Sequence, residues 1–281
     1  MFDRLERSWQ LVKFSGRVLK QDKELMVFPV LSSIAGILVL ASFLPLIMGT
    51  ATTISTESLE QGQEQLNWVV LFFMYVIEYF VVFFFNAALV GAALERIHGG
   101  DPTVSSGLKI AFSRIGAIFG YAVIAATVGT ALRFIGERVG FIGKIVVGLS
   151  GALWSLATFM VVPVLVSRSI GPVDALKDSL NLMKRTWGEN IIANAGLGVF
   201  FGIIYFLGMI LMLTFVGLGA GFSGEAAIGL FAVFAIFFLM IGVVHATMQG
   251  IFSAALYHYA VGGEDDAGIP ADVLGVAFSE K

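Results

Sequence analysis

The stretch Trp68–Leu94, WVVLFFMYVIEYFVVFFFNAALVGAAL, decides the fold of this chain. It is apolar over almost its whole length and carries a single charged residue, Glu78. The hydrocarbon core of a bilayer is about 30 Å thick, and a helix that rises ~1.5 Å per residue needs about 20 apolar residues to cross it. The stretch therefore predicts a transmembrane helix.

Five further stretches share this character, at residues 25–48, 115–132, 145–166, 191–218 and 226–248. The composition agrees, because 58% of the 281 residues are hydrophobic and 13% are charged, whereas about 25% of the residues of a soluble domain are charged. We therefore expect an all-α fold, a polytopic transmembrane bundle of six spans. It should form one domain over residues 1–260, followed by a short acidic cytoplasmic tail, 261–281.

The charges between the spans predict the orientation. Lys and Arg are frequent in the first 24 residues, whereas the connection 50–66 carries three Glu and neither Lys nor Arg. The positive-inside rule then places the N-terminus in the cytoplasm, and an even number of spans returns the C-terminus there. Arg133, Arg138 and Lys144 oppose this arrangement, because they fall in an expected external connection. A third span that does not cross would overturn the orientation.

The first apolar run should remain in the mature protein as a membrane anchor. It is longer than the apolar region of a signal peptide, and no small-residue cleavage site follows it. We expect a multi-pass protein of the cell membrane, the inner or cytoplasmic membrane of a bacterium.

A surface helix is predicted before the first span, at residues 3–20. Trp9 lies on its apolar stripe, while Lys13, Arg17 and Lys20 line the flank. A basic amphipathic helix of this kind lies along a membrane and contacts anionic head groups. These four residues are therefore the candidate contacts with membrane lipid.

Two similar segments precede the third and fifth spans. Asp101 is the expected N-cap of the first of them, with Pro102 at its first helical position, and Pro172 opens the other. The order of surface helix, span, turn and span then occurs three times, which suggests a triplicated two-span unit. Any set of helical hairpins with basic cytoplasmic flanks would give the same order.

Two GxxxG motifs, Gly116–Gly120 and Gly198–Gly202, lie near the starts of spans three and five. Small residues at this spacing let helices approach closely in a membrane. Their matching positions favour packing inside the bundle over a dimer interface.

Three segments carry a resemblance to a known family: FDRLERSWQLVKFS (2–15), LMVFPVLSS (25–33) and RIHGGDPTVSSGLKIAFSR (96–114). They resemble bacterial six-span membrane proteins known as a domain of unknown function. The arrangement of surface helix and hairpin is more distantly similar to the membrane domain of some glycerophosphodiester phosphodiesterases. The resemblance implies a helical bundle in a bacterial or archaeal cell membrane, and it brings no site residues with it.

The sequence contains no recognisable catalytic or cofactor motif. It lacks cysteine, a Walker A loop, a GxSxG elbow and a dinucleotide fingerprint. Its three histidines, His98, His245 and His258, do not have the spacing of a zinc site. We therefore expect no enzyme activity, cofactor, metal or nucleic-acid partner.

Polar residues inside the spans are the candidate site, because each is costly in hydrocarbon unless it is paired or lines a wet cavity. They are Glu78, Asn86, Asn194, His245 and Gln249. Glu78 should lie near the middle of the bilayer and face other helices, and the others form a candidate cluster nearer the cytoplasm. Hydrogen bonding that fixes helix packing is the alternative role for all five.

The functional prediction is a non-enzymatic membrane protein that scaffolds partners or lipid at the cytoplasmic membrane. Its expected partners are membrane lipids and a second membrane protein, and the sequence leaves the oligomeric state open. The alternative is a small transporter or channel that uses Glu78, Asn86 and His245.

Overall fold

The computed structural model describes residues 13–52, 60–218 and 224–261, with backbone alone at 47–52, 60–67, 185–196, 218, 225 and 259. Over these residues the chain is helical and has no strand. A helix over residues 13–21 is followed by η1 (Lys23–Met26), α2 (Val27–Thr52), α3 (Glu60–Ile97), α4 (Val104–Ser113), α5 (Ile115–Arg138), α6 (Phe141–Thr158), α7 (Val161–Ser167), α8 (Pro172–Leu218) and α9 (Gly224–Ala260).

Six segments of the described residues are long and apolar enough to cross a membrane: Lys23–Leu46, Trp68–Ile97, Ile115–Arg138, Phe141–Ser167, Leu197–Gly217 and Ala226–His258. The prediction of an all-α protein with six candidate spans is confirmed. The fourth segment joins α6 and α7 across a short break.

Several helices are longer than the apolar stretches from which they were predicted. α5 continues to Arg138, and only Val139 and Gly140 separate it from α6. The expected external connection is therefore mostly helical. Arg133 is accommodated there because it pairs with Glu137, one turn further along the same helix, at 3.0 Å.

A helix, α4, lies where the second surface helix is predicted, but its cap differs from the prediction. Thr103 is the N-cap, and Thr103 and Ser106 exchange hydrogen bonds in a capping box. Asp101 lies before the helix and instead accepts a hydrogen bond from Arg96 at 2.8 Å. The assignment of Asp101 as the cap was wrong, because a capping box at Thr103 satisfies two backbone groups at once.

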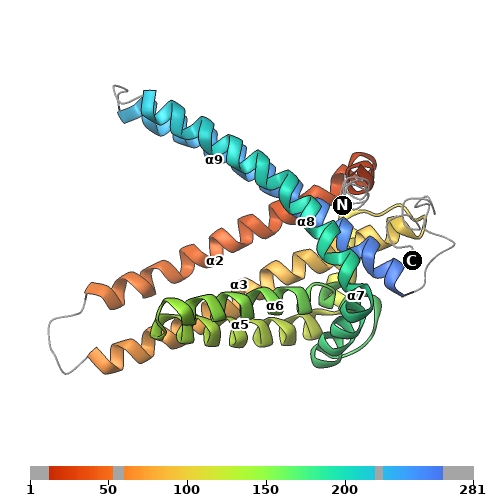
Figure 1. Cartoon of the computed structure of the whole chain (residues 1–281), viewed down its shortest axis with the longest axis horizontal. Coiled ribbons are helices and arrows are strands. Elements are labelled where there is room, and N and C mark those ends of the chain that lie inside the picture. The colour runs from red at the N-terminus through yellow and green to blue at the C-terminus, as the bar shows by residue number, and fades with distance from the viewer. Residues whose placement is uncertain (1–12, 53–59, 219–223, 262–281) are drawn as a thin grey trace.

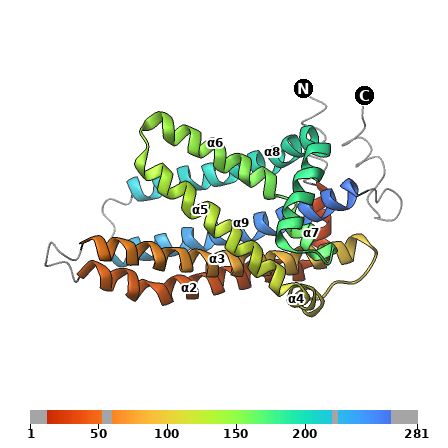
Figure 2. The ribbon, with the colours of Figure 1, turned by 90° about the horizontal axis from the view of Figure 1, so that it is seen from below.

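The third predicted surface helix is not separate from the fifth span. α8 begins at Pro172, as expected, and continues to Leu218 as one helix. Figures 1 and 2 show its first turns beside α7 and its later part alongside α9.

The hairpins are tightly packed at one end and diverge at the other. Figure 1 shows α2, α3, α5 and α6 running together, while α8 and α9 separate from them as a pair. α4, α7 and the last turns of α3 and α9 lie at one end of the bundle, which we call the α4 end.

The buried core lies towards the α4 end. It is formed by residues 87–94 of α3, 160–165 around the start of α7, and 251–257 of α9. Away from it, large apolar side chains of α2, α8 and α9 are exposed, as in Leu38, Ile203 and Phe231. Such surfaces are expected where helices face lipid.

Candidate functional site

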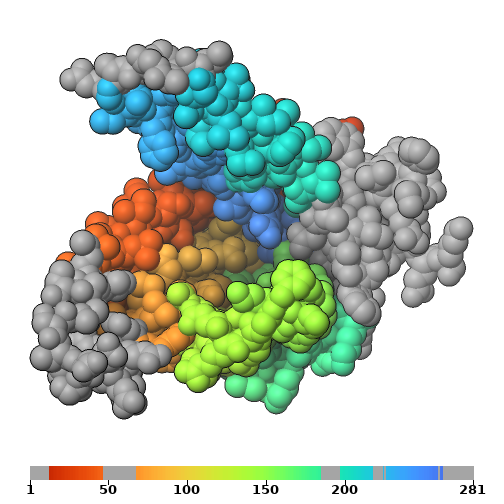
Figure 3. All heavy atoms as spheres, turned by 60° about the vertical axis from the view of Figure 1, so that its left-hand side comes forward, coloured from red at the N-terminus to blue at the C-terminus, as the bar shows by residue number. Residues whose placement is uncertain are grey.

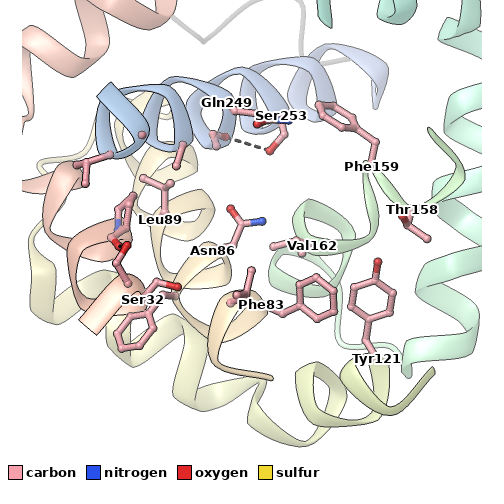
Figure 4. A pocket seen from close by; sticks show the side chains of 18 of the residues that line it. Ser32, Phe83, Asn86, Leu89, Tyr121, Thr158, Phe159, Val162, Gln249 and Ser253 are labelled. Carbon is pink, nitrogen blue, oxygen red and sulfur yellow. Dashed lines mark hydrogen bonds between the residues drawn. The ribbon is translucent and has the colours of Figure 1, made fainter. Parts of the chain in front are cut away.

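A cavity of about 610 Å³ lies where the hairpins separate, between α2, α3, α5, α6, α7 and α9. Its walls are mostly apolar, with a small set of polar groups. The polar groups include Ser32, Asn86, Tyr121, Thr158, Gln249 and Ser253. Figure 4 shows the Asn86 amide reaching into the space between these helices, with Gln249 on the α9 side. The space-filling view shows a hollow between the α8–α9 pair and the other helices (Figure 3).

A break in the fourth span forms part of the cavity wall. Pro163 has no backbone N–H, and its ring would clash with the carbonyl group of Phe159, four residues earlier in a continuous helix. The chain accordingly leaves helix α6 after Thr158 and starts α7 at Val161. Phe159 and Thr158 both line the cavity.

Ser179 of α8 stabilises this break. Its hydroxyl group donates a hydrogen bond of 2.7 Å to the carbonyl oxygen of Ala157, and the Ser179 side chain is fully buried. Irregular backbone at membrane depth occurs where protein covers it or where it lines a cavity. Both conditions are met here.

The two amide side chains of the cavity have unused hydrogen-bonding capacity. Neither Asn86 nor Gln249 makes a hydrogen bond to a side chain or backbone group in the described part of the chain. A primary amide has two donors and an acceptor with two lone pairs. In an apolar wall these groups are available to a neutral polar ligand.

The cavity is closed on the side of the α4 end. Gly250 of α9 lies so close to α3 that a Cβ atom there would be 2.4 Å from a methyl carbon of Leu89. Phe252 packs beside Phe159, with ring centroids 6.0 Å apart, and is almost fully buried. Among the described residues the hollow therefore ends on a packed floor.

Two charge networks hold the helices together near that floor. Arg96 at the end of α3 binds Asp22, which is 7% exposed, through two hydrogen bonds. Arg168, after α7, binds Asp178 of α8 at 2.6 Å. Hydrogen bonds to Tyr257 and then Asp178 raise the pKa of Arg168, so its guanidinium group stays charged.

The structure separates Glu78 from the predicted cluster. Glu78 faces α2, where the absence of a side chain at Gly36 makes room for its carboxyl group: a Cβ atom at Gly36 would lie 2.8 Å from Glu78 Oε1. Its Oε2 atom is shielded and has no hydrogen-bond partner among the described residues. Glu78 does not line the cavity.

His245 also lies apart from the cavity, in the contact between α8 and α9. Its ring stacks on Phe201 with centroids 4.3 Å apart, and its Nδ1 atom lies 3.5 Å from the Tyr205 hydroxyl group. Of the five predicted intramembrane residues, the structure brings Asn86 and Gln249 to one cavity. The side chain of Asn194 lies outside the described residues.

The predicted surface contacts are partly described. Trp9 lies outside the described residues, whereas Lys13, Arg17 and Lys20 are all exposed. On the other side of the same helix, Phe14 and Val18 are buried in the core. The helix at 13–21 therefore packs its apolar side on the bundle and turns its basic side outward.

The sequence patterns missed the remaining polar lining and the break. Ser32 and Ser253 are common residues in apolar spans, and nothing in their spacing distinguishes them. Pro163 was the available signal, since a proline inside a span is expected to interrupt it. Within the described residues, no group of three or more His, Asp or Glu is placed to hold a metal ion.

The chain belongs to a family of unknown function, DUF6159, whose profile matches residues 65–267. No curated protein matches the chain. The family carries no activity with it, so a functional conclusion depends on the cavity.

Proposed function

We propose that this member of the DUF6159 family is a non-enzymatic integral membrane protein that binds an uncharged amphiphile, such as a lipid with a neutral head group. The observation that carries the proposal is the presence of Asn86 and Gln249, with unused amide groups, in a cavity of about 610 Å³ between separating hairpins. Ligand sites commonly combine apolar walls with a few polar groups that orient the ligand.

The lining supports a neutral ligand rather than an ion. Asp, Glu, Lys, Arg and His are all absent from the described lining. A charged group placed there would lose its hydration without gaining a counter-ion, which is strongly unfavourable. A hydroxyl, amide or ester group pairs with the two amides without that cost, while its hydrocarbon chain contacts the apolar walls.

The same lining supports a role without catalysis. A serine or threonine nucleophile needs an adjacent base, and the described lining provides hydroxyl groups but neither an imidazole nor a carboxylate. His245 precedes the lining residue Ala246 in sequence, but its imidazole ring contacts Phe201 and Tyr205 instead of the cavity.

For the orientation we propose that the α4 end faces the cytoplasm in the cell membrane. The exposed Lys13, Arg17 and Lys20 then meet anionic head groups, and the acidic connection 50–66 lies outside. A reporter fused after Lys281 should give a cytoplasmic signal, and one inserted at Gln61 an external signal. A cytoplasmic signal at Gln61 would reverse the orientation.

The cavity proposal is tested by the lipid that the purified protein retains. We expect Asn86→Leu and Gln249→Leu each to lower the amount of neutral lipid recovered by mass spectrometry about fivefold, the effect of one lost hydrogen bond. Asn181→Leu is the matched control, because Asn181 is exposed on α8 outside the cavity. Equal recovery from all three variants would refute the proposal.

Transport is the second candidate function, and the break between α6 and α7 favours it, since interrupted helices often form the binding sites of transporters. Protein in liposomes with a pH-sensitive dye inside would test for proton-coupled flux. Flux that Glu78→Gln abolishes would assign transport. We favour binding, because Glu78 does not line the cavity and the floor at the α4 end is closed.

Scaffolding of a second membrane protein is compatible with lipid binding and is a separate proposal. Crosslinking in intact membranes, followed by purification of the tagged chain, would identify such a partner. If the tagged chain is recovered only without a crosslinked partner, the result would argue for a role through lipid alone.

A further inference from the structure

A second, separate groove lies near the opposite end of the bundle from α4. It has a volume of about 640 Å³ and is formed by Trp68, Val69 and Phe72 of α3 and by Thr127, Thr130, Ala131 and Phe134 of α5. Its walls are apolar apart from the threonine hydroxyl groups and the indole. The cavity of the proposed function shares none of these residues.

A positive charge lies at the end of this groove. The guanidinium carbon of Arg138 is 3.7 Å from the centroid of the Phe134 ring, and Phe134 packs edge-on against Trp68 with centroids 5.5 Å apart. Thr127, Ala131, Phe134 and Arg138 follow one another at helical spacing, so they lie on one face of α5. The charge and the groove are therefore available to a single ligand.

Arg138 differs from its neighbour Arg133 in what it binds. Arg133 donates to the Tyr75 hydroxyl group at 2.7 Å and to Glu137 at 3.0 Å. Arg138 makes no ion pair with any residue in the described ranges, and its side chain is exposed. Its charge is thus available to an anion outside the chain.

Thr130 adds a polar group inside the groove. Its Oγ1 atom makes no hydrogen bond within the described chain and is shielded from water, so a rotation about the Cα–Cβ bond presents the hydroxyl group to a ligand in the groove. Because the Arg138 guanidinium group folds back over Phe134, it lies about one helical turn from Thr130, or ~6 Å along the axis. In a glycerophospholipid only the glycerol backbone separates the phosphate from the ester carbonyl groups.

We propose that this groove binds an anionic phospholipid, with the phosphate at Arg138, an ester carbonyl at Thr130 and an acyl chain between α3 and α5. Charge complementarity selects an anionic head group, because Arg138 is cationic. Arginine pairs strongly with phosphate through charge-assisted hydrogen bonds. Trp68 at the groove also fits the preference of tryptophan for the membrane interface.

The first test is native mass spectrometry of the detergent-purified full chain, titrated with phosphatidylglycerol or phosphatidylcholine. We expect the wild type to bind phosphatidylglycerol more tightly. Arg138→Gln should weaken phosphatidylglycerol binding about fivefold and phosphatidylcholine binding by less, because the choline group already offsets the charge of the phosphate. The control Lys109→Gln removes the same charge from an exposed position on α4, and should preserve the preference.

Thr130→Val gives a different signature. It keeps the shape of the side chain and removes the hydroxyl group, so binding of both lipids should fall equally, by about fivefold for one hydrogen bond. Equal affinity of the wild type for the two lipids, or equal losses in Arg138→Gln and Lys109→Gln, would overturn the proposal.

A second experiment measures the fluorescence of Trp68 and leaves every residue of the groove unchanged. Replacing Trp9, Trp154 and Trp187 by Phe leaves Trp68 as the single tryptophan. Brominated phosphatidylglycerol should then quench its fluorescence more strongly than brominated phosphatidylcholine. Equal quenching would refute a specific site. Since the two sites share no residue, loss of binding here leaves the cavity proposal unaffected.

Discussion

The pairing of Arg96 with two carboxylates gives a sharp test of what holds the hairpins together. Arg96 at the end of α3 binds Asp22, before the first span, and Asp101, before α4. The two carboxylates differ in burial, since the Asp22 side chain is 7% exposed and that of Asp101 is 92% exposed. The same guanidinium group therefore makes one buried and one solvent-exposed ion pair.

Replacing each aspartate by asparagine keeps the shape and removes the charge. Removing one partner of a fully buried ion pair typically costs about 3–5 kcal/mol. Arg96 is itself 28% exposed and keeps Asp101, so we expect Asp22→Asn to lower the free energy of unfolding by about 2–3 kcal/mol. An exposed pair contributes about 0–1 kcal/mol, so Asp101→Asn should change it by less than about 1 kcal/mol.

The assay is reversible unfolding in mixed micelles, in which the mole fraction of SDS is raised and helicity is followed by circular dichroism. Measuring both variants and the double variant in one detergent removes the effect of the micelle. A loss in Asp101→Asn as large as that in Asp22→Asn would show that burial does not set the strength of these pairs, and would refute the reasoning.

Three further predictions concern packing and capping, and each is measured as a change in thermal stability in detergent. Gly107→Ala should cost about 1–3 kcal/mol, because a Cβ atom there would lie 2.5 Å from the ring of Phe28; Gly116→Ala, which meets nothing within 4 Å, should be neutral or stabilising. Thr103→Ala removes the capping box of α4 and should cost about 1 kcal/mol, and an unchanged stability would mean that α4 needs no cap. Ser179→Ala leaves the carbonyl group at the α6–α7 break unpaired and should cost about 1–3 kcal/mol, and an unchanged stability would show that this hydrogen bond does not stabilise the break.

The helices themselves were predictable because burial in a bilayer requires long apolar runs. The ends of the helices were not, since they depend on contacts between residues distant in sequence or one turn apart. Arg133 lay outside the predicted third span, yet in the structure it belongs to α5 through Glu137 and Tyr75. A hydropathy pattern penalises such a charge and does not register its partners.

The glycines show a similar limit. The predicted GxxxG motifs are Gly116–Gly120 and Gly198–Gly202. A Cβ atom at Gly116, Gly198 or Gly202 would meet no other atom within 4 Å, whereas one at Gly120 would lie 2.9 Å from the ring of Pro172 at the start of α8. Other close approaches occur at glycines outside these motifs, such as Gly36 beside Glu78 and Gly107 beside Phe28. Spacing identifies glycines that could permit contact, but the facing helix decides which of them do.

The candidate site was predictable in part. Asn86 and Gln249 were identified because amides in a span require partners, and they line one cavity. The direction of Glu78 towards α2 and of His245 towards α8 depends on how the hairpins are arranged around one another. Several arrangements satisfy the same six apolar faces, so the faces alone do not specify which polar residues meet.

The position of the cavity follows from where the hairpins are held together. Near the α4 end, Gly250 allows α9 to approach Leu89 of α3, and Arg168 ties the end of α7 to Asp178 of α8. Ion pairs and close backbone approach need not continue along the spans, because lipid covers the diverging apolar faces as readily as another helix does. The space between the hairpins therefore begins just beyond the packed floor. Asn86 and Gln249 lie at that boundary. They lie just before the buried core segments of α3 and α9, and their side chains line the cavity.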